Sequence, residues 1–136
     1  MRPSNKGDHE LKGWFGKYLI SQGHYNIQTT TKFCPYDLSS EKDGILYYWE
    51  LKVRHRKALD GKYNDTCCED IKVKDSPNPA RSFLVSFFDD YWTVTPYKEL
   101  TDKQYVKAQI SERNKRHIKK IFLSHPLKES ELKDYE

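Results

Sequence analysis

The sequence has few cysteines, and their arrangement makes two classes of protein unexpected. Cys34, Cys67 and Cys68 are an odd number without a framework of spacings, so a disulfide-rich secreted domain is not expected. The three cysteines and five histidines form no C-x-x-C or H-x-x-x-H spacing, so a zinc site is not expected either. Reduced thiols in a cytoplasmic protein are the simplest interpretation.

Long apolar runs and glycine-rich loops are also missing. No run of about 18 apolar residues occurs, so no transmembrane helix is expected. Residues 1–8 have no apolar core of the kind found in signal peptides. There is no phosphate-binding loop of the Walker or dinucleotide type and no local signature of a Ser/His/Asp triad. The chain of 136 residues is long enough for one domain with a real core.

The most informative segment is a predicted β-hairpin. Asp43-Gly44 lies between two strand-like stretches, and this dipeptide favours a two-residue turn in which both residues have positive φ. Counting outward from such a turn places Asp37 directly opposite Glu50. Because strand side chains alternate between faces, Lys52 lies on the same face as Glu50. A turn of three or four residues would shift this register.

Two acids and a lysine on one patch of a sheet need a chemical explanation. Opposed like charges on neighbouring strands are destabilising, since their Cβ atoms lie only about 5 Å apart. A hard divalent cation between Asp37 and Glu50 would remove the repulsion. Lys52 beside that cation could hold a water molecule or stabilise charge on a phosphate. The alternative is a solvated sheet face with an incidental Glu50–Lys52 pair.

These residues resemble the motif of the PD-(D/E)XK nucleases, the restriction-endonuclease-like superfamily. In that pattern a Pro-Asp or a bare Asp is followed, after a variable spacer, by Asp/Glu-x-Lys on the next strand. The chain has Pro35-Tyr36-Asp37, a spacer of twelve residues, and then Glu50-Leu51-Lys52. Tyr36 departs from the pattern, although the superfamily holds the Asp rather than the Pro. The resemblance covers residues 8–97 in the order of elements.

The resemblance implies a nuclease that depends on Mg²⁺ or Mn²⁺ and hydrolyses phosphodiester bonds, with DNA as the expected substrate. Asp37, Glu50 and the backbone carbonyl of Leu51 would bind the metal, and Lys52 would orient or activate the attacking water. Glu10 is a further candidate ligand, but an acid in the first turn of a helix is also favoured by the helix dipole. The small size resembles junction resolvases and compact phage or mobile-element nucleases. A homodimer would provide one site for each strand of a duplex.

Two alternatives remain open at this point. The first is an inactive nucleic-acid-binding or protein-interaction module on the same fold, against which the intact Asp37, Glu50 and Lys52 argue. The second is an RNA- or tRNA-directed factor without a metal, in which a basic helix binds unaided.

The predicted fold class is α/β (α+β), a restriction-endonuclease-like αβββαβ core whose mixed central sheet is flanked by helices. Residues 1–136 form a single domain with its core at 8–97, a basic helical segment at 101–124, and a tail at 125–136 that could be frayed. The predicted elements are a helix at 8–22, a strand at 24–33, a strand carrying Asp37, a strand at 45–53, a helix at 63–75, and strands at 83–88 and 91–95.

Basic residues gather in two places outside the motif. One is the segment 52–57, directly after the hairpin, and the other is the predicted C-terminal helix, where three basic positions share one helical face. Either cluster could bind a phosphate backbone or simply form a solvated surface. The candidate nucleic-acid contacts are Arg54, Arg56, Lys57, Lys62, Arg113, Arg116 and Lys120.

Overall fold

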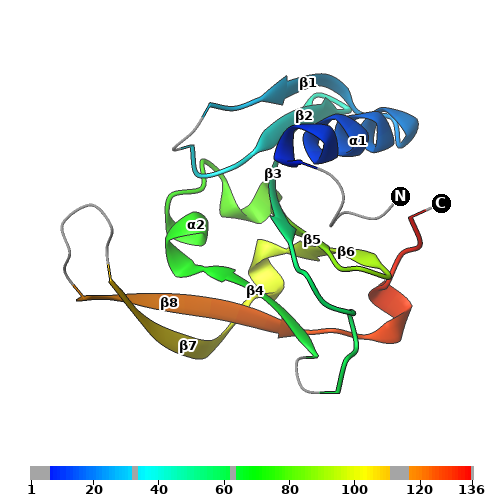
Figure 1. Ribbon diagram of the computed structural model, residues 1–136. Helices are drawn as coiled ribbons and strands as arrows, with labels where there is room; N and C mark the ends of the chain where they lie inside the picture. Colours follow the sequence, from blue (N-terminus) through cyan, green and yellow to red (C-terminus); the bar gives the residue numbers. More distant parts are fainter. Residues whose placement is uncertain (1–6, 32–33, 62–63, 111–116, 136) are drawn as a thin grey trace.

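The computed structural model describes residues 7–31, 34–61, 64–110 and 117–135. They form two sheets, a five-stranded sheet covered by one helix and a three-stranded sheet on its other side (Figure 1). Within the described residues, no helix has the length and apolar character needed to cross a bilayer. The elements are α1 Asp8–Ser21, β1 Tyr25–Thr29, β2 Leu38–Lys42, β3 Ile45–Val53, β4 Asp65–Glu69, α2 Asp70–Lys74, η2 Pro79–Arg81, β5 Ser82–Phe87, β6 Trp92–Pro96, η3 Tyr97–Glu99, β7 Thr101–Ile110, β8 His117–Pro126 and η4 Glu129–Glu131, where η marks a 3-10 helix.

The five-stranded sheet has the order β1-β2-β3-β5-β6. Strands β1, β2 and β3 are antiparallel neighbours, β3 pairs with β5 in parallel, and β5 pairs with β6 antiparallel. The predicted mixed central sheet is therefore confirmed. In β1, Asn26 has a φ of 51°, and the register with β2 shifts between Tyr25 and Gln28. This outer strand is thus irregular.

The predicted hairpin is present with the predicted register. Asp43 and Gly44 have φ values of 53° and 76°, as a two-residue turn requires. Lys42 pairs with Ile45, and the same register continues without a shift to Leu38 opposite Trp49. The local turn chemistry therefore determines how β2 and β3 align.

One face of the sheet carries the main core. Leu11, Phe15 and Leu19 of α1 are at most 2% exposed and pack against Trp49 and Phe87 on the strands. The rings of Phe15 and Trp49 meet edge to face, with centroids 5.2 Å apart. Since alternate residues of β3 face this core, its remaining residues face the second sheet.

The C-terminal segment 101–124 was predicted as a helix, and this prediction is wrong. Its described residues form the antiparallel strands β7 and β8, in which Lys107 pairs with Lys120 and Ile110 with His117 (Figure 1). The predicted helix placed three basic residues on one of its faces. Strand β8 instead hydrogen-bonds on both sides, to β4 and to β7, and this pairing outweighs the local pattern.

The helix predicted at 63–75 is divided in the structure between a strand and a short helix of equal length. Residues 65–69 form β4, whose Cys68 pairs with Leu123 of β8, and only the five residues of α2 are helical. Cys68 of β4 is fully buried, whereas Ile71 of α2 is exposed. The partner of β4 lies far along the chain, so the local sequence gives no sign of it.

The tail is docked rather than frayed up to residue 135. Lys133 forms an antiparallel bridge with Trp92, with N–O distances of 3.0 and 2.8 Å between the two backbones. The indole of Trp92 donates to the carbonyl of Asp134 at 2.9 Å. The hydroxyl of Tyr135 donates to the carbonyl of Phe88. The tail therefore covers the outer edge of β6.

Candidate active site

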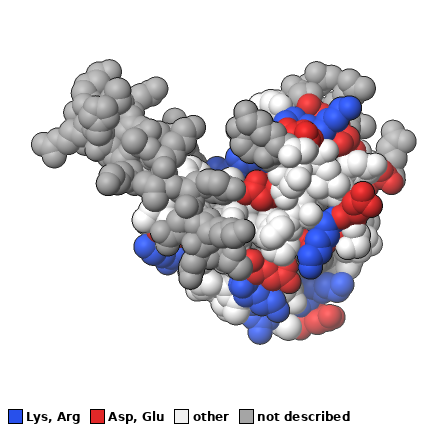
Figure 2. Space-filling model, turned by 90° about the horizontal axis from the view of Figure 1, so that it is seen from below, with Lys and Arg blue, Asp and Glu red and all other residues white. Residues whose placement is uncertain are grey.

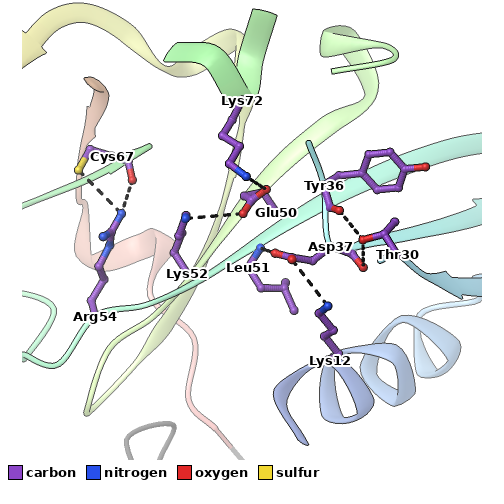
Figure 3. Close-up of polar contacts among 10 residues, drawn as sticks. All are labelled: Lys12, Thr30, Tyr36, Asp37, Glu50, Leu51, Lys52, Arg54, Cys67 and Lys72. Atoms are coloured by element: carbon purple, nitrogen blue, oxygen red, sulfur yellow. Dashed lines mark hydrogen bonds and ion pairs between the residues drawn. The ribbon is translucent and has the colours of Figure 1, made fainter. Parts of the chain in front are cut away.

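An open cavity of about 690 Å³ lies where the second half of β3 passes between α1 and α2. Its lining comes from α1, the segment leading into β2, the end of β3, and α2 with the residue after it. Asp37, Glu50 and Lys52 all line it, so the structure brings together the three residues that the motif predicts (Figure 3).

Asp37 is held at the entrance to β2 by backbone contacts on both sides. Its N–H donates to the carbonyl of Trp49 at 2.8 Å, and its own carbonyl accepts from the N–H of Thr30 at 3.1 Å. Its Oδ2 accepts from the N–H of Leu51 at 2.8 Å, and its Oδ1 lies 3.9 Å from the ammonium of Lys12 (Figure 3). The carboxylate is thereby directed across the hairpin towards the segment around Glu50.

Glu50 is a buried acid with an incompletely satisfied carboxylate. The residue is 3% exposed, and among the described residues its Oε2 accepts no hydrogen bond. The ammonium groups of Lys52 and Lys72 lie 3.8 Å from Oε1 and 3.6 Å from Oε2 (Figure 3). Burial raises the pKa of Glu50 to about 7, and the nearby carboxylate of Asp37 adds to this rise, while Lys72 and Lys52 oppose it.

Two of the lysines at this site were missed by the sequence reasoning. Lys12 follows Leu11, so its place at the edge of the buried stripe of α1 could have been found from the helical pattern. Lys72 gave no such signal, because the position of α2 depends on the pairing of β4 with the distant β8. Both lysines reach carboxylates that the motif assigns to a metal.

The residues present fit a divalent cation. A buried carboxylate oxygen without a hydrogen bond is costly unless a cation compensates it. The carboxylates of Asp37 and Glu50 offer oxygen ligands, which Mg²⁺ and Mn²⁺ prefer. Lys52 and Lys72 contact Glu50 only at ion-pair distances, so they do not occupy the place of a ligand on Oε2. Glu10 is exposed and is not part of the cavity lining, to which α1 contributes Leu11 and Lys12 instead.

The predicted nucleic-acid contacts are only partly described. Arg54 donates to the carbonyl of Cys67, and Arg56 donates to the carbonyl of Asp65 at 2.7 Å and lies over the ring of Phe88. Both guanidinium groups therefore tie the segment after β3 to the second sheet.

Of the other predicted basic contacts, Lys57 is exposed, whereas Lys62, Arg113 and Arg116 lie outside the described residues. Lys120 belongs to β8, and its side chain is likewise outside them. On the face seen from below, basic and acidic side chains are interspersed over the described body (Figure 2). That face of the described body therefore shows no extended surface of one sign.

Comparisons with known proteins give little beyond this geometry. No protein-family model matches the chain, and no curated protein matches it. Among solved structures, the chain is similar to Hjc, a Holliday junction resolvase from Archaeoglobus fulgidus. The TM-score is 0.49 and the identity 13%, over 92% of each chain. At this level the similarity carries no argument of its own.

Proposed function

We propose that the protein is a nuclease that uses a divalent metal ion to hydrolyse phosphodiester bonds, with DNA as its substrate. The observation that carries the proposal is the buried Glu50 carboxylate, whose Oε2 lacks a hydrogen bond among the described residues and whose cavity also contains Asp37 and Lys52. Buried polar atoms without a partner are uncommon in folded proteins, and a bound ion is one of the explanations for them.

Each residue has a role that follows from its position. Asp37, Glu50 and the carbonyl of Leu51 would hold Mg²⁺ or Mn²⁺, which when bound supplies an acidified water and withdraws charge from the phosphate. Lys52, on the same cavity wall, would orient that water and stabilise the negative charge that develops on the phosphate. Lys12 and Lys72 compensate the carboxylates when the metal is absent.

The proposed substrate, DNA, rests on the resemblance of the motif to that of the PD-(D/E)XK nucleases. Junction-resolving and compact phage or mobile-element nucleases have this motif on a small chain, so branched DNA belongs among the substrates to test. One cavity cuts one strand, and a homodimer would supply the second cut. Basic side chains would contact the phosphate backbone of the substrate. Among the predicted basic contacts whose side chains the structure describes, Lys57 is the exposed one.

A second candidate function is supported by the lysines. Each carboxylate already has an ammonium group within 4 Å, since Asp37 lies beside Lys12 and Glu50 beside Lys52 and Lys72. A cavity balanced in this way can bind nucleic acid or a protein without a metal. In that case the protein would be an inactive module on the same fold.

Cleavage assays separate the two functions. The substrates are a linear duplex, a single strand, a supercoiled plasmid and a four-way junction, each incubated with Mg²⁺ or Mn²⁺ and with EDTA as a control. We expect metal-dependent cutting that Asp37→Asn and Glu50→Gln abolish while binding and folding are kept. Asp89→Asn, an exposed carboxylate in the turn between β5 and β6, is the matched control and should cut normally. Equal cutting by the wild type and both site variants would contradict the mechanism, and salt-sensitive binding without any cutting would favour the inactive module.

A further inference from the structure

A second group of metal-ligating side chains lies outside the cavity. Glu99 ends η3, His125 lies near the end of β8, and Glu131 ends η4. One ligand atom from each lies within 4.8 Å of the other two. None of the three lines the cavity that contains Glu50. We propose that these residues bind a first-row transition-metal ion of the zinc type, which fastens the C-terminal tail to the end of β8.

The distances suit a single ion. The Nε2 atom of His125 lies 3.1 and 3.3 Å from the carboxylate oxygens of Glu131, and 3.9 Å from Oε2 of Glu99. Metal–ligand bonds of about 2.0–2.2 Å in a tetrahedron put neighbouring ligand atoms roughly 3.3–3.6 Å apart. Small rotations of the two glutamate side chains would bring all three atoms to these separations.

The three side chains differ in how far they are exposed to solvent. The side chain of His125 is 12% exposed, that of Glu131 is 26% exposed and that of Glu99 is 46% exposed. The imidazole is therefore fixed within the structure while the outermost carboxylate faces solvent. An ion has a path of entry on the side of Glu99, and a water molecule can complete its coordination there.

The donor set selects the kind of cation. Two carboxylates beside a neutral imidazole leave a net negative charge that a divalent ion removes. Imidazole nitrogen favours zinc, cobalt, nickel or copper, whereas Mg²⁺ and Ca²⁺ prefer oxygen alone. The ion expected here thus differs in class from the one proposed for Asp37 and Glu50. Sequence spacing gave no sign of this group, because its three members come from separate segments.

The bound ion would have a structural role, since it would hold η4 against the end of β8. The backbone carbonyl of Glu131 accepts from the hydroxyl of Thr93 on β6 at 3.1 Å, so η4 already rests against the five-stranded sheet. His125 belongs to the strand that pairs with both β4 and β7. An ion joining these residues would link the two sheets through the tail. Because the unfolded chain has no preformed site, the binding free energy would add to the stability of the fold.

Calorimetric titration of the full chain with Zn²⁺ alone, after treatment with a chelator, tests the proposal. We expect one strong site, retained in the Asp37→Asn/Glu50→Gln double variant and weakened at least about tenfold in His125→Gln and in Glu131→Gln. Glu99→Gln, at the most exposed ligand, gives a variant whose folding is not at risk. The matched control is Glu129→Gln, at an exposed acid in η4, the 3-10 helix that also contains Glu131. This variant should bind Zn²⁺ as the wild type does.

Two further readouts decide between the possible outcomes. Co²⁺ should give the visible spectrum of a four- or five-coordinate ion without a thiolate charge-transfer band, and thermal unfolding should move to higher temperature with Zn²⁺ only when His125 is present. A thiolate band would place the ion on a cysteine and overturn the proposal. Zn²⁺ binding that is unchanged in Glu99→Gln and His125→Gln would also overturn the proposal, and so would the absence of any Zn²⁺ binding. None of these readouts depends on nuclease activity.

Discussion

Glu50 is the residue of the site at which burial, ion pairing and protonation act together. It is buried beside a second carboxylate and lies within 4 Å of two ammonium groups. Burial raises its pKa to about 7, so near neutral pH the proton, the lysines and a metal ion compete for the same oxygens. This competition can be measured in two ways at the scale of single residues.

The first prediction concerns stability against pH in the metal-free protein. The pKa of Glu50 is about 7 in the folded chain, above its ordinary value of 4.5, so the folded state holds the proton more tightly. The protonated Glu50 therefore adds to the free energy of unfolding. This contribution is fully present below pH 4.5 and is lost as the pH rises towards 7, at up to about 1.4 kcal/mol per pH unit. Urea unfolding of the wild type and Glu50→Gln across this range should give curves that diverge in this window. Parallel curves would show that Glu50 does not titrate there.

The second prediction separates Lys52 from the metal ligands. Lys52→Met should lower kcat for DNA cleavage by about 10²-fold or more, because a positive charge placed against the transition state is removed. The affinity for Mn²⁺, measured by calorimetry, should not fall, since Lys52 donates no ligand. Lys17→Met, at an exposed lysine of α1 outside the cavity lining, is the control and should retain its kcat. A loss of Mn²⁺ binding in Lys52→Met would instead make this lysine part of the metal site.

Among the elements, those fixed by local chemistry were predictable and those fixed by distant pairing were not. The Asp43-Gly44 turn determines the register of β2 against β3, and counting along this register is enough to bring Asp37 beside Glu50. The strand β4 and the hairpin of β7 and β8 depend on one another's hydrogen bonds. Their sequences therefore predicted helices, and the same error concealed Lys72.

A pair of glycine substitutions tests two elements that the sequence predicted from local chemistry, the helix α1 and the turn between β2 and β3. Gly13 lies inside α1 with open space where a Cβ would be, so Gly13→Ala should stabilise the protein by about 0.5–1 kcal/mol. Gly44 has a φ of 76° in the turn, so Gly44→Ala should destabilise it by about 1 kcal/mol or more. Urea midpoints measure both. The same sign for the two substitutions would contradict the helix or the turn as described.

At the scale of the whole molecule, the C-terminal tail packs against helix α1 and the turn between β5 and β6. Tyr135 packs against Trp14 of α1 with ring centroids 6.2 Å apart, and its hydroxyl donates to the carbonyls of Phe88 and Tyr91. The second sheet meanwhile packs against the five-stranded sheet, where Cys68 of β4 and Leu123 of β8 share a cluster with Leu84, the ladder partner of Glu50. The position of the site therefore depends on elements outside the predicted core.

The tail should contribute measurably to stability. Tyr135→Ala should lower the free energy of unfolding by about 2 kcal/mol, because a partly buried ring is lost. Tyr135→Phe keeps the ring and should cost about 1 kcal/mol for the lost hydrogen bonds. Tyr91→Phe, at an exposed tyrosine, is the control and should have little effect. Wild-type stability in Tyr135→Ala would show that the tail is not docked in solution.

The irregular β1 and the bridge between Lys133 and Trp92 together determine how the molecule can meet other copies of itself. Exposed edge strands are templates for strand addition and aggregation, and bulges or covering segments block them. Here one edge of the five-stranded sheet is distorted at Asn26 and the other is capped by the tail. Two copies that associate are therefore not expected to extend the five-stranded sheet from one copy into the other. Loss of the tail would uncover β6 as a new edge and favour edge-to-edge aggregation.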